Sequence, residues 1–296
     1  MDSRSLLLLD GTAELYRSYY AFKDLRTKAN VPTGAAFGFA LALQRLLDSE
    51  KPTHAAVAFD LPDATFRHEA YAEYKATRKP TPPDLVAQIP VVKQIVAAYA
   101  IPVVEVSGFE ADDVIATLVT MAKRESVDVT IVAQDKDFYQ LLDDGVWILN
   151  QKKGRLDRVS AEQLLGIPPG RIPDLLALMG DSSDNIPGVD GIGEKGAKKL
   201  ISEFGTIDAV YRNLDKVGNP KLKARLESQR DRAYLSYALA LMHHDVPIGR
   251  SLAAFSVRNP DSAALCRIFE SLEFSSLAAK FRTYEPVQGD LFGDTD

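Results

Sequence analysis

The sequence predicts an α/β protein with a mostly parallel central sheet flanked by helices, followed by a C-terminal helical region. Short apolar runs end in acidic residues, as in residues 6–9 before Asp10 and 55–59 before Asp60. Strand and helix signals alternate over residues 1–150, and strand signals largely vanish after about residue 160. Short apolar runs are typical of strands buried on both faces of a parallel sheet, and their alternation with helices is typical of βαβ units.

The elements of the first half follow from this pattern. The strand that ends at Asp10 precedes two helices, and the strand that ends at Asp60 follows them. Proline lacks an amide donor, so Pro90 is expected to kink or interrupt the next helix. The remaining elements alternate as expected for this class. In chain order the predicted helices are 13–22, 34–49, 83–99, 110–125 and 136–142, and the further strands are 102–106, 128–133 and 146–149.

The second half reads as helices, at 160–165, 171–179, 194–203, 206–213, 221–243 and 260–271. We therefore expect an α/β core over residues 1–160 and a helical region over 161–284. Residues 285–296 are polar, acidic and contain glycine, a composition typical of a disordered tail.

Composition limits the class of protein. Of the 296 residues, 46% are hydrophobic and 26% charged, as in ordinary globular proteins, and no apolar run is long enough to span a bilayer. The single Cys266 excludes an internal disulfide and fits the cytoplasm. We expect a monomer without membrane contact. The net charge of −6 argues against nucleic-acid binding, unless bound cations offset many of the acids.

Acidic residues gather where the predicted strands end. The carboxyl ends of parallel strands meet at one crevice, and carboxylates that converge there repel one another unless cations neutralise them. With four histidines and one cysteine in the chain, Mg²⁺ or Mn²⁺ is favoured over Zn²⁺. A single aspartate after a strand is more often a cap or turn residue. The candidate metal ligands are Asp10, Asp60, Glu110, Asp112, Asp113, Asp135, Asp137, Asp181 and Asp184.

Residues 61–82 interrupt the β-α alternation and leave the strand that ends at Asp60. This segment is basic and aromatic, a combination that suits DNA, although a solvated surface helix is the simpler interpretation. The candidate DNA contacts in the segment 61–82 are Arg67, Tyr74, Lys75, Arg78 and Lys79.

Glu110 and Asp113 are three residues apart, so both are expected on one face of a helix.

A glycine-rich stretch precedes the predicted helix at 194–203. Glycine lets the backbone approach a phosphate closely, and amides at a helix N-terminus favour anions. The pattern resembles the helix-hairpin-helix grip on a DNA backbone, with a tight interhelical turn as the alternative. A P-loop is excluded because no Gly-Lys-Ser/Thr is present. The candidate residues are Gly188, Gly191, Gly193, Lys195, Lys198 and Lys199.

Several motifs together resemble a known family. They lie at 9–17, 58–60, 66–78, 108–113, 134–137 and 180–188, and include Glu110-Ala111-Asp112-Asp113 and Asp135-Lys136-Asp137. Over roughly residues 5–282 the chain resembles the 5′-nuclease domains of bacterial DNA polymerase I, within the flap endonuclease and phage 5′-exonuclease superfamily. Gln134 and Gly196 depart from the usual family residues, but neither is a proposed ligand.

The resemblance implies a 5′-3′ exonuclease and 5′-flap endonuclease that hydrolyses DNA phosphodiesters at flaps, nicks and branched ends during replication and repair, with two or more Mg²⁺ or Mn²⁺ ions. It assigns Asp10, Asp60, Glu110 and Asp112, with Asp113 beside them, to the more catalytic metal cluster. The remaining acids form the second cluster.

The resemblance also assigns roles to the basic segment and the glycines. Residues 61–82 match a helical arch that the 5′ strand passes through, where Lys75 and Arg78 act on the scissile phosphate and Tyr74 is placed to stack on a base. The stretch 188–193 matches a duplex-holding hairpin whose carbonyls bind K⁺.

Two alternatives and one further motif remain. PIN-type nucleases also place acids at strand ends but are shorter and lack the glycine hairpin, and a non-catalytic DNA-binding module would have no need of the intact acid set. In the tail, Gln288, Leu291 and Phe292 fit the Gln-x-x-Leu-Phe peptide with which bacterial replication proteins dock on the sliding clamp, although three fixed positions can also match by chance.

Overall fold

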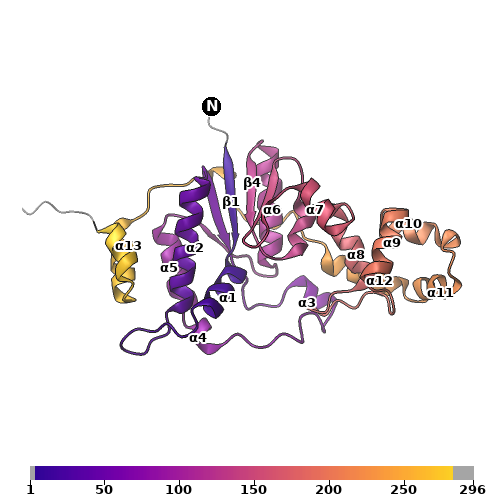
Figure 1. Cartoon of the computed structure of the whole chain (residues 1–296), viewed down its shortest axis with the longest axis horizontal. Coiled ribbons are helices and arrows are strands. Elements are labelled where there is room, and N and C mark those ends of the chain that lie inside the picture. Colours follow the sequence, from indigo (N-terminus) through magenta and orange to yellow (C-terminus); the bar gives the residue numbers. More distant parts are fainter. Residues whose placement is uncertain (1–3, 283–296) are drawn as a thin grey trace, which may run out of the picture.

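The computed structural model describes residues 4–282 and is built around a six-stranded sheet (Figure 1). The strand order is β3-β2-β1-β4-β5-β6, and all pairs are parallel except β5 with β6. The predicted mostly parallel sheet is therefore confirmed. The strands are β1 Ser5–Asp10, β2 His54–Ala58, β3 Val103–Val104, β4 Asp128–Val132, β5 Val146–Asn150 and β6 Gly154–Leu156.

The leucine run of β1 shows why these strands are continuously apolar. Successive side chains of a strand point to opposite faces of the sheet. Leu6 and Leu8 accordingly join the core on one face, and Leu7 and Leu9 join the core on the other. None of the four is more than 3% exposed. A strand covered on both faces has no position left for a polar side chain until it ends, at Asp10.

Helices cover both faces of the sheet (Figure 1). Helices α1, α2 and α5 pack on one face and α6 on the other. Within residues 4–282 no helix has the length and apolar character needed to cross a bilayer. The helices of this half are α1 Gly11–Ala21, α2 Gly34–Glu50, α3 Phe66–Ala70, α4 Pro83–Val86, α5 Ile89–Ala98, α6 Ala111–Arg124 and the 3₁₀ helix η1 Lys136–Leu141.

The C-terminal helices divide between the two sides of the sheet. Helices α7 to α12 extend the core on the α6 side, whereas α13 and α14 return to pack beside α5 (Figure 1). The helical region expected over 161–284 is therefore not one body. Its elements are α7 Arg158–Leu165, η2 Pro169–Arg171, α8 Ile172–Met179, α9 Glu194–Phe204, α10 Ile207–Arg212, η3 Leu214–Lys216, α11 Pro220–Ser228, α12 Arg230–Ala240, η4 Leu252–Phe255, α13 Ser262–Ser271 and α14 Ser275–Phe281.

Three segments compare with their predictions as follows. The interruption expected in the helix at 83–99 is present, since the segment is broken into α4 and α5, with Pro90 in the first turn of α5, where proline is tolerated. The helix expected at 221–243 breaks at Gln229, whose side chain accepts a hydrogen bond from the Asp190 amide. The segment 61–82 contains only the five-residue α3. Its Lys75 adopts φ 56°, a left-handed conformation that an α-helix cannot contain.

The sheet contains one topological switch point. From β1 the chain runs through β2 to the β3 edge and then returns to β4 on the other side of β1. In open α/β sheets ligands bind at the carboxyl ends of the strands where the order reverses. The end of β1, at Asp10, lies at this point.

Candidate active site

The first group of acids lies at the carboxyl ends of β1 and β2 and at the start of α6. Asp10 ends β1 and caps α1, since its Oδ1 accepts the Ala13 amide at 2.9 Å. Asp60 follows β2 and accepts the amide of Ala111 through Oδ1 at 2.8 Å, which ties this strand end to the first turn of α6. That turn carries Glu110 and Asp112. Asp10 therefore acts as a helix cap, and Asp60 lies beside the turn that carries Glu110 and Asp112.

The second group lies beyond β4 and after α8. Asp135 caps η1 and accepts the amide of Asp137 at 2.9 Å. Asp181 and Asp184 lie in a turn in which the Oδ1 of Asp181 accepts the amide of Ser183 at 2.9 Å. Asp135 and Asp181 are thus each fixed by a local hydrogen bond in a short turn.

In the first group, burial and repulsion between carboxylates raise the pKa values of Asp10 and Asp112. The pKa of Asp10 is raised to about 7, chiefly by burial and also by the charges of Asp60 and Asp135, against the opposing effect of the Ala13 amide. Burial also raises the pKa of Asp112 well above its usual range, and Asp10 and Asp60 add to this effect. The acids of this group are therefore close enough to repel one another, as the sequence predicts.

The second group behaves in the same way. Burial raises the pKa of Asp137 to about 8, and the charges of Asp135, Asp181 and Asp184 add to this effect. The Oδ1 atom of Asp137 is buried and has no hydrogen-bond partner among the residues that the structure describes. A buried oxygen without a donor is costly, and a cation would satisfy it. Asp135 also lies close enough to the first group for its charge to act on Asp10.

Within the described part of the chain, no three acidic or histidine side chains stand in position to hold a metal ion as they are. Side-chain cations lie among the acids instead. Nζ of Lys75 lies 2.7 Å from Oε1 of Glu110 and 3.7 Å from Oδ2 of Asp184, so it bridges the two groups. Arg78 pairs with Asp184 at 2.5 Å. Both residues therefore face the carboxylates.

The structure gives Tyr74 a different place from the predicted one. Its side chain is 3% exposed, and its hydroxyl donates to Oε2 of Glu110 at 3.1 Å and to Oδ2 of Asp184 at 3.2 Å. A ring buried in this way has no face available for a base. Tyr74 therefore holds the two acid groups together, whereas Lys79 is exposed on the outside of the segment.

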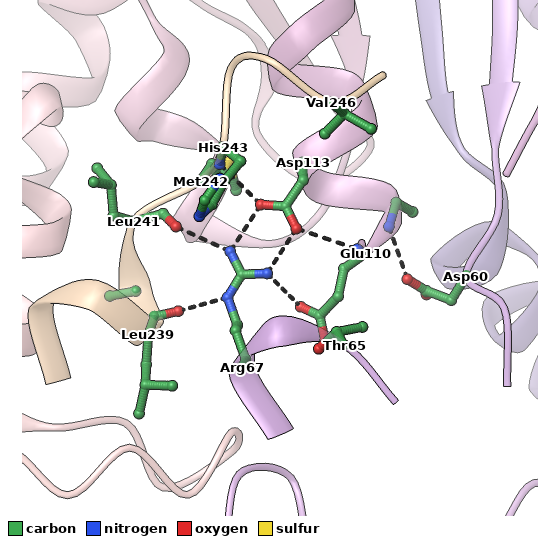
Figure 2. A network of polar contacts seen from close by, with 12 residues as sticks. Asp60, Thr65, Arg67, Glu110, Asp113, Leu239, Leu241, Met242, His243 and Val246 are labelled. Atoms are coloured by element: carbon green, nitrogen blue, oxygen red, sulfur yellow. Dashed lines mark hydrogen bonds and ion pairs between the residues drawn. The ribbon is translucent and has the colours of Figure 1, made fainter. Parts of the chain in front are cut away.

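Arg67 and Asp113 also differ from their predicted roles (Figure 2). Arg67 is 2% exposed and Asp113 is 0% exposed, and two hydrogen bonds of 2.7 and 2.8 Å join the guanidinium to the carboxylate. Arg67 therefore cannot contact DNA, and the Asp113 carboxylate is already neutralised by a protein cation. Glu110 and Asp113 do share a helix face, but it is Arg67 that meets it, with Nη1 3.4 Å from Oε2 of Glu110.

The glycine stretch forms a close-packed turn before α9. Gly188 has φ 60°, and a Cβ at this position would lie 2.3 Å from the Gly180 nitrogen. Its buried amide donates to Oγ of Ser236 at 2.9 Å, so it is not available to a phosphate as predicted. Gly191 and Gly193 are exposed, and Gly193 is the N-cap of α9. The α9 N-terminus thus lies at the surface of the turn.

The lysines of α9 lie near this turn. Lys195 and Lys199 are exposed, and Lys198 pairs with Glu194 at 2.7 Å one helical turn earlier. This exposed basic helix start fits the predicted phosphate-contacting surface.

Several residues that support the hairpin and the acids through hydrogen bonds and ion pairs could not be recognised in the sequence. Arg232 donates to the Pro187 carbonyl at 3.3 Å and pairs with Asp190 at 3.1 Å, and Ser236 accepts from the hairpin as described. Thr12 accepts the Asp60 amide at 2.9 Å. Among these residues, only Ser236 could be placed from the sequence, because the apolar and small residues around it indicate a buried helix face.

The raised pKa values predict an unusual dependence of stability on pH. The ordinary pKa of an aspartate is 3.8, so between about pH 4 and pH 8 the folded chain holds protons on Asp10 and Asp137 that the unfolded chain releases. Without divalent cations, the free energy of unfolding should therefore be highest below about pH 4 for this contribution and fall as the pH rises through about 7 to 8.

Melting curves between about pH 5 and pH 8 in EDTA and in excess Mg²⁺ check this expectation. Asp137→Asn should flatten the EDTA profile, because the amide cannot ionise, and Mg²⁺ should restore stability to the unchanged chain at the upper end of the range. A wild-type profile in EDTA that matches that of Asp137→Asn would contradict the assignment.

Comparison with family models identifies both halves of the chain. The model of the 5′-3′ exonuclease N-terminal resolvase-like domain matches residues 5–166. That of the 5′-3′ exonuclease C-terminal SAM fold matches residues 167–263.

Among curated proteins, DNA polymerase I of Bacillus caldotenax is 39% identical over 285 residues, which is 95% of this chain and 32% of the relative. That of Thermus aquaticus is 39% identical over 280 residues, 95% of this chain and 33% of the relative. The chain thus spans about a third of the length of these relatives.

Solved nuclease structures share the fold. T5 5′-exonuclease with bound zinc ions superimposes with a TM-score of 0.66 at 22% identity, covering 93% of this chain and 100% of that one. The catalytic core of Rad2 in complex with DNA substrate does so with a TM-score of 0.63 at 18% identity, covering 94% and 91%. From the two family matches and the polymerase I relatives together, the chain belongs to the 5′-3′ exonuclease family.

Proposed function

We propose that the chain is a metal-dependent, structure-specific 5′-nuclease that hydrolyses DNA phosphodiesters at 5′ flaps, nicks and branched ends. The observation that carries this proposal is the juxtaposition at the switch point of the sheet. Two groups of mutually repelling carboxylates lie there, and Lys75 of the basic segment bridges them. Relatives supply the class of reaction, since the T5 and Rad2 structures are nucleases solved with metal ions or DNA substrate.

The residues present fit two or more hard divalent cations, which we take to be Mg²⁺ or Mn²⁺. All the donors are carboxylate oxygens, and the buried Oδ1 of Asp137 has no other partner among the described residues. When bound, such cations supply Lewis-acid activation of the attacking water and offset charge on the leaving oxygen. The first group would comprise Asp10, Asp60, Glu110 and Asp112, and the second Asp135, Asp137, Asp181 and Asp184.

The side chains of the basic segment have a separate part in this proposal. Lys75 and Arg78 pair with the carboxylates of Glu110 and Asp184, and they would act on the scissile phosphate when cations neutralise the acids. Their positive charge then stabilises the charge that develops on the phosphate. Lys79, exposed at the end of the segment, would contact the single strand.

The hairpin and the start of α9 would hold the duplex. The Gly193 cap makes no side-chain hydrogen bond to the helix, which favours a phosphate on the first-turn amides, and Lys195 and Lys199 add positive charge. We also propose that the backbone carbonyls around Gly191 bind K⁺. We keep a division near residue 160 between a nuclease core and a DNA-holding part, since the last strand ends at Leu156.

Cleavage of a labelled 5′-flap duplex, with Mg²⁺ and with EDTA, tests the function. A discrete product near the junction that requires the divalent cation is expected. DNA binding without cleavage under all metal conditions would favour the alternative of a non-catalytic DNA-binding module. The length of the chain and its family membership argue against a PIN-type nuclease.

A finer partner is proposed from the tail, which lies outside the described residues. Gln288, Leu291 and Phe292 fit the clamp-binding peptide pattern, and tethering to a clamp would raise the local concentration of the nuclease at flaps. A peptide of residues 284–296 titrated against the sliding clamp should bind saturably, and replacing Leu291 and Phe292 by alanine should abolish binding. A peptide that binds equally well without these two side chains would refute the assignment.

We further propose that the protein is a monomer and that it acts in the cytoplasm.

A further inference from the structure

We propose that Arg67 and Asp113 are positioning residues that set the distance between the hairpin and the carboxylates, and so determine which phosphodiester is cut. The inference rests on the proposed nuclease function. Three parts of the chain meet at this pair (Figure 2): α3 of the basic segment, the first turn of α6, and the chain that leaves α12.

All the nitrogens of the Arg67 guanidinium are engaged in this junction. Nε donates to the Leu239 carbonyl at 2.8 Å and Nη2 to the Leu241 carbonyl at 2.9 Å, so both ends of the fork hold the end of α12. The same guanidinium makes the two bonds to Asp113. The five donors of a planar guanidinium can serve two carbonyls and a bidentate carboxylate at once, whereas an ammonium group has three donors and no such fork.

Asp113 receives hydrogen bonds from two backbone amides in addition to Arg67. Its Oδ2 accepts the amide of Glu110 at 3.1 Å, and its Oδ1 accepts the amide of His243 at 2.9 Å. The backbone of Glu110 is therefore fixed relative to His243, three residues after the end of α12.

Helix α12 carries this link to the hairpin. Its Ser236 accepts the amide of Gly188 and its Arg232 donates to the Pro187 carbonyl. One turn further on, Leu239 and Leu241 present their carbonyls to Arg67. A rigid helix thus joins the hairpin at one point and the Glu110 turn at the other.

The length of this path matters because the phosphodiesters of duplex DNA are regularly spaced. Successive base pairs rise by about 3.4 Å, so slack of that size between hairpin and carboxylates would bring a neighbouring phosphodiester to the site. Loss of the link should therefore spread the cut over adjacent positions, whereas a general loss of stability would leave the position unchanged.

The first test compares product lengths on one 5′-flap substrate in saturating Mg²⁺, below the melting temperature of every variant. Arg67→Lys, Asp113→Asn and, at the far end of α12, Ser236→Ala should each replace the dominant product by products shifted by one or two nucleotides. Asp174→Asn is the matched control, because Asp174 is also buried, pairs with Arg171 and accepts the amide of Ile207. A single cut at the wild-type position in the three link variants would overturn the proposal.

The second test needs no cleavage and separates this inference from the proposed function. Duplex DNA is added in EDTA, and hydrogen exchange is followed at the amides of Glu110 and His243, both of which donate to Asp113. Exchange should slow on DNA binding in the wild type and be unaffected by DNA in Arg67→Lys. Failure of the wild type to cut any flap would refute the function alone, whereas equal exchange with and without DNA in the wild type would refute the link.

Discussion

Asp112→Asn is expected to lower flap cleavage by about 10³-fold while DNA binding stays the same or tightens, because about 4 kcal/mol of cation-dependent stabilisation corresponds to that factor. Asp112 is one of the acids whose pKa is raised by burial and by Asp10 and Asp60, so its charge lies where cations are proposed to bind. Removal of one negative charge also reduces repulsion of the DNA phosphates.

Single-turnover rates and dissociation constants at fixed salt measure the two effects separately. Asp174→Asn again serves as the control, since it removes a buried acid that lies outside both groups and contacts α10 instead. A rate for Asp112→Asn near that of the wild type in saturating Mg²⁺ would remove Asp112 from the metal site.

Lys75→Ala and Arg78→Ala should slow the chemical step by about 10²-fold or more and weaken duplex binding much less, because the lost charge acts on the developing charge of the phosphate. The structure adds a second expectation. Nζ of Lys75 lies between Glu110 and Asp184, where its charge would oppose the binding of a metal cation. Lys75→Ala should therefore bind Mg²⁺ more tightly even as it cuts more slowly.

The double change of Lys198 and Lys199 to alanine provides the contrast, since these residues lie on α9 beside the hairpin and are expected to contact phosphate only. It should weaken duplex binding and leave the single-turnover rate at saturating protein unchanged. If both pairs of changes lowered affinity alone, the division between a catalytic segment and a duplex-holding helix would be wrong.

The sequence predicted those features that depend on short-range pattern. The leucine run of β1 could only be a strand covered on both faces, and its closing Asp10 lies at the switch point, as expected from parallel topology. The grouping of the acids followed from the same rule. The glycine before α9 likewise marked a turn, although it did not reveal which amides face outward.

The errors concern contacts between distant parts of the chain. Asp112 and Asp113 are adjacent and chemically alike, and only the fold shows that Asp113 meets an arginine 46 residues earlier. The two carbonyls that bind Arg67 lie 172 and 174 residues away, and a backbone carbonyl leaves no mark on sequence composition. The left-handed conformation of Lys75 in the basic segment was equally invisible, since lysine is an ordinary helix former.

The contact between Gly180 and Gly188 has a consequence for the cost of binding a cation. It brings together the ends of a loop that Asp181 and Ile186 close with two backbone hydrogen bonds of 2.7 and 2.9 Å. Two of the candidate ligands, Asp181 and Asp184, lie in this loop, so their backbone is ordered when the protein folds and not when the ion arrives. Capture of a cation there should involve little loss of conformational entropy, and its free energy should be governed by dehydration and charge.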